Sequence, residues 1–278
     1  MKILITGSNG MLAYALKKTL KKENRLILAD IDNMDITKTK EVSNFFTKAK
    51  PEFVIHTAAY TDVDGAQNNK SLAFKINRDG TRNVAMAAKK MDIPVVYIST
   101  DYVFGDNKRK PYTENDRPNP LSIYGLSKYA GEKEARKNPK HYIVRSAWLY
   151  GPNGKNFVLT ILRLAKELDE LKIVNDQRGC PTYTFDLAEG IAKLIKTNKF
   201  STYHLTNSGS STWYQFAKEI LKIKKIKKKV LPITSKELNR PAKRPSYSVL
   251  SGAKINRLKI RLKSWQKALK NYLKTIKL

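Results

Sequence analysis

The stretch Thr6-Gly7-Ser8-Asn9-Gly10-Met11-Leu12-Ala13 joins an apolar run, Lys2–Thr6, to a helical pattern that begins at Met11. Gly7 permits a tight turn, and Gly10 lets the backbone approach a pyrophosphate at a helix N-terminus, where free N–H groups attract anions. Ala13 stands where a third glycine is usual and is small enough for close helix–strand contact. The context is the one that a dinucleotide-binding fingerprint requires. A plain strand–turn–helix is the alternative that position alone leaves open.

Around this turn, short apolar runs alternate with helical patterns through the first half of the chain. The expected strands are Lys2–Thr6, Arg25–Ala29, Phe53–Thr57, Val95–Thr100 and Tyr142–Arg145. The expected helices are Met11–Lys22, Thr39–Lys48, Leu72–Met91 and Ser122–Lys137. Such alternation indicates βαβ units, and nearly continuous apolar strands indicate a parallel sheet covered by helices on both faces. The sequence therefore predicts an α/β fold with a Rossmann-type doubly wound parallel sheet.

After about residue 150 the alternation loosens, and a smaller C-terminal substrate-binding region is expected. Its elements are the helices Phe157–Leu168, Asp186–Thr197, Thr212–Lys222 and Ser264–Ile276 and the strands Leu171–Val174 and Thr202–Leu205. We expect a Rossmann domain over residues 1–150, with 184–206 returning to it. Residues 151–183 and 207–278 then form the substrate-binding region. The lysine–isoleucine run over 222–229 favours a solvated face or a strand edge.

Composition excludes some functional classes. The 278 residues carry a formal charge of +30, which admits nucleic-acid binding. No zinc-finger spacing, helix-turn-helix pattern or aromatic RNA-binding motif accompanies that charge, so we favour a lysine-rich solvated surface and expect no nucleic acid. The single cysteine, Cys180, excludes an internal disulfide, and no apolar segment approaches the ~20 residues that span a bilayer. Because the N-terminus reads as a strand rather than a signal peptide, we expect a soluble cytoplasmic protein without a membrane partner.

Two segments after expected strands bear on the cofactor. Asp30 ends the second strand, where a carboxylate would bind the adenosine ribose hydroxyls and disfavour a 2′-phosphate. Nearby Arg25 and the lysine excess leave NADPH open beside NADH. The small residues of His56-Thr-Ala-Ala-Tyr-Thr61 would let a loop lie against the dinucleotide, although a tight strand exit fits equally well. His56 itself lies within an apolar strand, so we expect a core histidine and, with the other two histidines scattered, no metal site.

Tyr124 and Lys128 are the candidate catalytic pair. At i and i+4 they share one helix face, and a neighbouring cation favours the phenolate of a Tyr whose ordinary pKa is about 10. Thr100 ends an expected strand, where ligands of open α/β sheets bind. A hydroxyl, a phenol and a lysine together meet the needs of ketone reduction, which are a polarised carbonyl, a proton donor and a group that tunes the phenol and holds the nicotinamide ribose. The spacing alone would also fit an exposed helix face.

Five segments resemble the extended short-chain dehydrogenase/reductase superfamily and, more narrowly, the dTDP-4-dehydrorhamnose reductase family. They are Thr100-Asp-Tyr-Val-Phe104, Tyr124-Gly-Leu-Ser-Lys128, Asn175-Asp-Gln-Arg-Gly-Cys-Pro-Thr182, Tyr203-His-Leu-Thr-Asn-Ser-Gly209 with Trp213, and Arg244-Pro-Ser-Tyr-Ser-Val-Leu250. The dehydrogenase motifs alone fix only the superfamily. The three later segments are more specific, and the resemblance spans essentially the whole chain.

The resemblance implies a role for each matching position. Tyr124 is the implied proton donor and Lys128 its partner, while Thr100, Asp101, Trp148 and Arg244 are implied to contact the substrate. The implied cofactor contacts are Gly7, Gly10, Met11, Leu12, Asp30, Asp35, Ile36, Ala59, Tyr60, Thr61, Tyr124 and Lys128. Relatives often form homodimers, some with a magnesium ion held by acidic residues. The tail of this chain is nearly devoid of carboxylates, which argues against magnesium.

The implied reaction is reduction of the C4 ketone of a dTDP-linked 4-keto-6-deoxy sugar, dTDP-4-dehydro-β-L-rhamnose, by NADPH or NADH. Four alternatives stay open. One is a reductase of another nucleotide-linked 4-keto-deoxy sugar, and a second is a non-catalytic protein like the regulatory β subunit of methionine adenosyltransferase. An epimerase or dehydratase of the superfamily is the third, although Tyr102 stands where a dehydratase would need a Glu. The fourth is a nucleic-acid binder.

Overall fold

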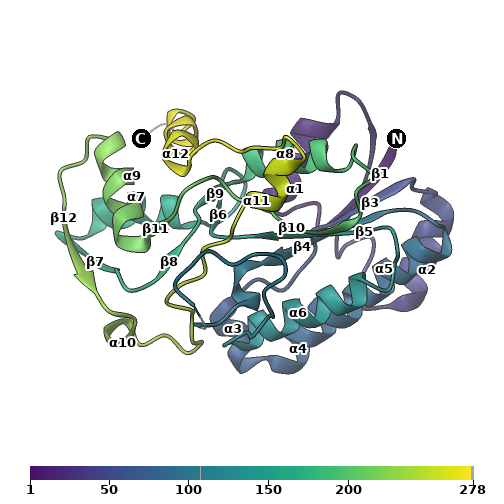
Figure 1. Ribbon diagram of the computed structural model, residues 1–278, viewed down its shortest axis with the longest axis horizontal. Coiled ribbons are helices and arrows are strands. Elements are labelled where there is room, and N and C mark those ends of the chain that lie inside the picture. The colour runs from purple at the N-terminus through teal and green to yellow at the C-terminus, as the bar shows by residue number, and fades with distance from the viewer. Residues whose placement is uncertain (107, 277–278) are drawn as a thin grey trace.

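The computed structural model describes residues 1–106 and 108–276, and its centre is a six-stranded parallel sheet (Figure 1). The strand order is β10-β5-β4-β3-β1-β2. The strands are β1 (Lys2–Thr6), β2 (Arg25–Ala29), β3 (Phe53–His56), β4 (Val95–Thr100), β5 (His141–Ser146) and β10 (Ser201–His204). From β1 the chain continues to β2 on one side and then to β3 on the other side, so the strand order reverses between β1 and β3. Ligands of such sheets bind at this point, beyond the carboxyl ends of the strands.

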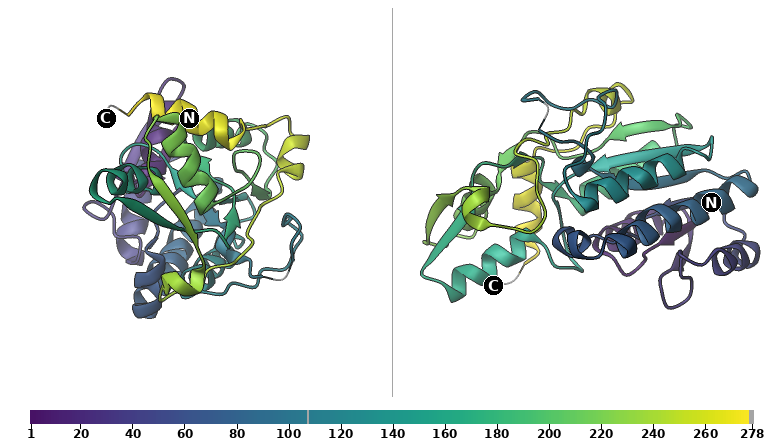
Figure 2. Two further views of the ribbon diagram at one scale, coloured as in Figure 1. Left: turned by 90° about the vertical axis from the view of Figure 1, so that its left-hand side faces the viewer. Right: turned by 90° about the horizontal axis from the view of Figure 1, so that it is seen from below.

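Helices cover both faces of the sheet (Figures 1 and 2). One face carries α1 (Met11–Leu20), α8 (Thr184–Leu194) and α11 (Ala253–Arg257). The other carries α2 (Thr39–Ala49), α3 (Val63–Asn68), α4 (Lys70–Phe74), the π-helix η1 (Lys75–Gly80), α5 (Thr81–Lys90) and α6 (Ile123–Ala135). Successive side chains of β1 point to opposite faces of the sheet. Ile3 and Ile5 pack in the core with α1 and α8, whereas Leu4 packs in the core with α2 and α5.

The remaining elements form a lobe beside the sheet, at the left of Figure 1. Its helices are α7 (Phe157–Glu167), α9 (Trp213–Ile223) and α12 (Trp265–Lys274), with the short α10 (Ser235–Leu238). Its strands pair as β7 (Glu170–Val174) with β12 (Lys229–Ile233), β8 (Arg178–Gly179) with β11 (Ser211–Thr212), and β6 (Leu149–Tyr150) with β9 (Thr182–Tyr183). A separate aromatic core that includes Tyr150, Phe216, Trp265 and Tyr272 lies inside this lobe.

The predicted α/β class and the predicted long elements are confirmed, with ends shifted by a few residues. The helix expected over Leu72–Met91 is instead divided into α4, η1 and α5. The lysine-rich run ends α9 and crosses a turn and loop before β12, so it is mainly a solvated connection, and only its last residue, Lys229, lies in a strand that pairs with β7. The helices α3, α10 and α11 were not expected, because four to six residues are too few to set up a helical period. Within the described residues, no helix is long and apolar enough to cross a bilayer.

Candidate functional site

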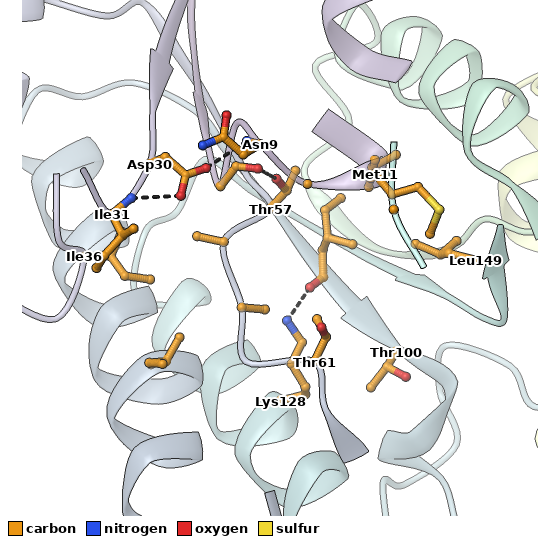
Figure 3. A pocket seen from close by; sticks show the side chains of 18 of the residues that line it. Asn9, Met11, Asp30, Ile31, Ile36, Thr57, Thr61, Thr100, Lys128 and Leu149 are labelled. Carbon is orange, nitrogen blue, oxygen red and sulfur yellow. Dashed lines mark hydrogen bonds between the residues drawn. The ribbon is translucent and has the colours of Figure 1, made fainter. Parts of the chain in front are cut away.

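A pocket of about 1050 Å³ lies at the carboxyl ends of the central strands (Figure 3). It brings together most of the residues predicted from the sequence. Those that line it are Gly7, Gly10, Met11, Leu12, Asp30, Asp35, Ile36, Ala59, Thr61, Thr100, Tyr124, Lys128 and Trp148. Tyr60, Asp101 and Arg244 were predicted as well but are not part of this lining.

The glycine turn forms one end of the pocket. Gly7 has a φ of +64°, and a Cβ there would lie 2.7 Å from the backbone N and Cα of Ala58, so the turn tolerates no side chain. Gly10 precedes the first residue of α1 and offers no side chain to cap it, so the first N–H groups of a helix that begins in the pocket lining have no side-chain cap. This end can bind a phosphate group.

Asp30 directly follows the last residue of β2 and lies beside this turn. One of its carboxylate oxygens accepts from the Asn9 backbone N–H at 2.8 Å and the other from the Ile31 N–H at 2.9 Å (Figure 3). Ile31, Met34 and Ile36 line the same end of the pocket and give it an apolar wall. An apolar wall with a carboxylate at its rim can hold an adenosine and its ribose hydroxyls.

His56 is a core histidine, as predicted. Its ring nitrogens lie 2.7 Å from the Thr6 hydroxyl and 3.2 Å from the Thr81 hydroxyl, and the residue is buried. Burial, together with the nearby Lys128 ammonium, lowers the pKa of His56 to about 3. A ring that is neutral at physiological pH and engaged at both nitrogens holds strands and helices together rather than transferring protons.

Helix α6 approaches β4 closely enough to bring Tyr124 to Thr100. Ser122 caps the helix by accepting from the Gly125 N–H at 3.2 Å. A Cβ on Gly125 would lie 2.2 Å from the Tyr102 carbonyl oxygen, so only glycine allows this approach. Further along the helix, the buried Glu132 accepts from Ser99 at 2.7 Å and pairs with buried Arg145 at 2.8 Å, which fixes α6 to the ends of β4 and β5.

Lys128 is buried and donates from Nζ to the Ile98 carbonyl oxygen at 2.7 Å (Figure 3). Its ammonium also lies 4.3 Å from the centre of the Tyr97 ring. Burial lowers the pKa of Lys128 to about 7, and Glu132 opposes this shift. The lysine is therefore poised to change charge near neutral pH.

The phenol of Tyr124 does not behave as the sequence suggested. We expected the lysine to lower its pKa, but burial raises the pKa of Tyr124 to about 12, and the hydrogen bond with Thr100 offsets only part of this shift. That expectation was wrong because the ammonium of Lys128 is directed at Ile98 and because the pocket wall desolvates the phenol. A phenol that stays protonated at neutral pH is suited to donate a proton.

Asp101 lies buried directly behind Thr100. Its two oxygens accept from the Thr100 hydroxyl at 3.1 Å and from the Ser248 hydroxyl at 2.6 Å. Burial raises the pKa of Asp101 to about 7, against the lowering effect of these hydrogen bonds. Its carboxyl therefore orients the Thr100 hydroxyl from behind the pocket wall.

The other two predicted residues outside the pocket lining have partners of their own. Arg244 forms a forked ion pair with Asp64, with N–O distances of 3.0 and 2.9 Å. The backbone of Tyr60 exchanges hydrogen bonds of 2.8 and 3.0 Å with the Asn77 side chain. The contact of Tyr60 holds the loop between Ala59 and Thr61, which line the pocket, whereas neither partner of the Arg244–Asp64 pair is part of the lining.

The loop that follows β6 lines the pocket as well, although the sequence did not lead us to expect it there. Asn153, Gly154 and Lys155 line the pocket, and the Asn153 side chain donates to the Asn9 carbonyl oxygen at 2.9 Å. The turn-forming residues Gly151-Pro-Asn-Gly154, directly after a strand, were the available signal. In residues 1–106 and 108–276, no three His, Cys, Asp or Glu side chains gather so as to hold a metal ion.

Comparison with known proteins gives consistent matches over the whole length. The family model described as RmlD substrate binding domain matches residues 1–278. The spore coat polysaccharide biosynthesis protein SpsK of Bacillus subtilis is 38% identical, with 98% of this chain and 96% of that protein covered. The crystal structure of a dTDP-4-dehydrorhamnose reductase from Clostridium acetobutylicum is 46% identical, with a TM-score of 0.96 and 99% of both chains covered. The enzyme of the same name from Bacillus anthracis, solved in complex with NADP, is 41% identical, with a TM-score of 0.96 and 99% of both chains covered.

Proposed function

The chain belongs to the dTDP-4-dehydrorhamnose reductase family, and on that premise we propose that it reduces the C4 ketone of dTDP-4-dehydro-β-L-rhamnose to give dTDP-L-rhamnose. The enzyme is an NAD(P)H-dependent oxidoreductase. One observation carries the proposal: a single pocket holds Thr100, Tyr124 and Lys128 at one end and a glycine turn for a dinucleotide at the other.

The residues present fit a nicotinamide dinucleotide. The turn at Gly7 leaves no room for a Cβ, and the uncapped start of α1 offers free N–H groups to a pyrophosphate. Asp30 would take the adenosine ribose, and Asp35 and Ile36 would line the adenosine end. Ala59, Tyr60 and Thr61 would lie along the dinucleotide, and Lys128 would reach the nicotinamide ribose. When bound, the cofactor supplies the hydride.

The proton is supplied by the protein. Tyr124, kept protonated by the burial that raises its pKa, donates its hydroxyl proton to the C4 oxygen of the sugar as the ketone is reduced. The Thr100 hydroxyl lies beside the phenol, and its single proton, which it donates to Asp101 in the free protein, turns to the same oxygen when the sugar binds. The Lys128 ammonium, when charged, stabilises the phenolate that remains. Trp148 forms the adjoining wall. Arg244 is proposed to contact the substrate, although its guanidinium is paired with Asp64 outside the pocket lining.

In this proposal one unit of the chain binds the cofactor and a second unit binds the substrate. Residues 1–150 with 184–206 form the dinucleotide-binding unit, which is supported by the position of β10 beside β5 in the central sheet. Residues 151–183 and 207–278 form the sugar-nucleotide-binding region. We assign the protein to the cytoplasm, where nucleotide sugars are made, as a homodimer without a nucleic-acid partner.

The test is a coupled assay of substrate and cofactor. Consumption of NADPH and of NADH is followed with dTDP-4-dehydrorhamnose, and the sugar formed is identified by mass spectrometry and NMR. Formation of dTDP-L-rhamnose supports the proposal. Turnover only with another nucleotide-linked 4-keto-6-deoxy sugar would change the substrate, and cofactor binding without turnover on any such sugar would favour a regulatory role.

A further inference from the structure

Trp148 has an unusual backbone for a residue of its size. It lies at a φ of +47°, in the left-handed region that bulky side chains rarely adopt, and it lines the pocket together with Thr100 and Tyr124. Such strain persists only where the surroundings over-determine it and is typical of functional sites. What fixes this side chain therefore bears on what the pocket binds.

Two residues of the C-terminal lobe fix the indole of Trp148. The ring of Trp213, the first residue of α9, stacks on it with centroids 3.5 Å apart and planes inclined by 6°. Gly179 leaves the space beside the indole nitrogen, because a Cβ there would lie 2.5 Å from Cε2 and 2.6 Å from Nε1 of the ring. The backbone is held as well, since the Thr182 N–H donates to the Trp148 carbonyl oxygen at 3.1 Å.

Trp213 is itself held in place from three sides. Its Nε1–H donates to Oε1 of the buried Gln177 at 3.1 Å, and the Gln177 amide donates onward to the Ser235 hydroxyl at 2.8 Å. The Phe157 ring packs against it with centroids 4.6 Å apart. Thr212 caps α9 and donates to the Asn175 side chain at 2.7 Å, so the segment that leads through Gln177 into β8 is tied to the start of the same helix.

We propose that Trp213, Gln177 and Gly179 are positioning residues for the sugar of the substrate, acting through Trp148. Trp213 covers one face of the Trp148 ring and Gly179 lies against it near Cε2 and Nε1, so only the part of the indole that lines the pocket is left to the substrate. A fixed aromatic wall favours the apolar C–H face of a deoxy sugar and orients its ketone toward Tyr124 without losing side-chain freedom on binding. The inference rests on the proposed function, since it names what presents Trp148 to that substrate.

The test compares three variants by their kinetics. Trp213→Leu removes the stacked ring and Trp213→Phe keeps an aromatic partner. Gly179→Ala displaces the indole of Trp148 without removing any of the side chains that surround it. In Trp213→Leu and Gly179→Ala we expect KM for the sugar nucleotide to rise about tenfold, with kcat and the Kd of NADPH changed by less than about threefold. Trp213→Phe should recover most of the wild-type KM. Tyr214→Leu is the matched control, because this neighbouring aromatic on α9 contacts Lys218 and is expected to leave all three constants unchanged.

Circular dichroism supplies a readout that does not depend on turnover. The stacked Trp148–Trp213 pair should give a strong tryptophan couplet wherever the two ring axes are rotated against each other, and Trp213→Leu should abolish that signal while Tyr214→Leu keeps it. The inference is overturned if the couplet is lost while KM stays at the wild-type value, if Gly179→Ala leaves KM unchanged, or if KM, kcat, cofactor affinity and melting temperature all deteriorate together. A wild type without turnover would remove the proposed function instead. In that case calorimetric affinity for dTDP-L-rhamnose in the same variants decides the inference, which stands if that affinity falls and fails if it does not.

Discussion

Replacement of Asp101 by Asn should make the folded protein more stable above neutral pH than the wild type. Burial raises the pKa of Asp101 from 3.8 to about 7 in the folded protein. Between these two values the folded state binds more protons than the unfolded state, so the stability of the wild type falls as the pH rises through this window. A shift of about three pKa units corresponds to about 4 kcal/mol across the window and to about 3 kcal/mol between pH 5 and pH 8. The Asn side chain does not ionise, and it retains an oxygen that accepts from Ser248.

Urea denaturation of both proteins at pH 5, 6, 7 and 8 measures this difference. The free energy of unfolding of Asp101→Asn relative to the wild type should rise with pH and level off above about pH 7, where the folded carboxyl has ionised. Subtracting the two curves removes the contribution of Lys128, which titrates in both. Asp32→Asn, at an exposed carboxylate, serves as the control and should run parallel to the wild type. A difference that stays constant from pH 5 to pH 8 would refute the argument that burial holds Asp101 protonated.

Three further substitutions probe how the pocket binds the cofactor. Lys128→Met should reduce kcat by at least about a hundredfold and also weaken NADPH binding, because the lysine serves both phenol and ribose; unchanged cofactor affinity by fluorescence titration would remove the ribose role. Asp30→Ser should raise the preference for NADPH over NADH by about tenfold, measured as the ratio of kcat/KM values, since a carboxylate repels a 2′-phosphate; an unchanged ratio would mean that Asp30 does not contact the ribose. Gly7→Ala should lower the free energy of unfolding, measured in urea, by at least about 2 kcal/mol and abolish cofactor binding. The reason is that the added Cβ collides with Ala58 and that the residue has a positive φ. A stable variant that binds NADPH would contradict the assigned turn geometry.

Features that depend on local sequence were predictable. The apolar runs of β1 to β5 and the periodic helices between them were identified because a strand buried on both faces and a helix with one apolar stripe each leave a regular pattern. The glycine turn and the Tyr124–Lys128 spacing were identified because each motif lies within a few neighbouring residues of the sequence.

Features that depend on contacts between distant segments were not predictable. The stack of Trp148 on Trp213 joins two elements far apart in the chain, and the ion pair of Arg244 with Asp64 joins the C-terminal region to α3. We expected a lowered pKa for Tyr124, and the structure shows a raised one. The spacing reveals a neighbouring cation but not the burial whose effect on the pKa is larger. The pKa of a side chain in a pocket depends on its desolvation as much as on the charged groups beside it.

The central claim is that Tyr124 donates the proton to the sugar, and Tyr124→Phe tests it most directly. The substitution removes only the hydroxyl, so the Kd of NADPH should stay within about twofold of the wild-type value while kcat for dTDP-4-dehydrorhamnose falls by about a hundredfold or more. That loss of turnover with intact cofactor binding is the predicted result. A Tyr124→Phe protein that forms dTDP-L-rhamnose at the wild-type rate would contradict the mechanism.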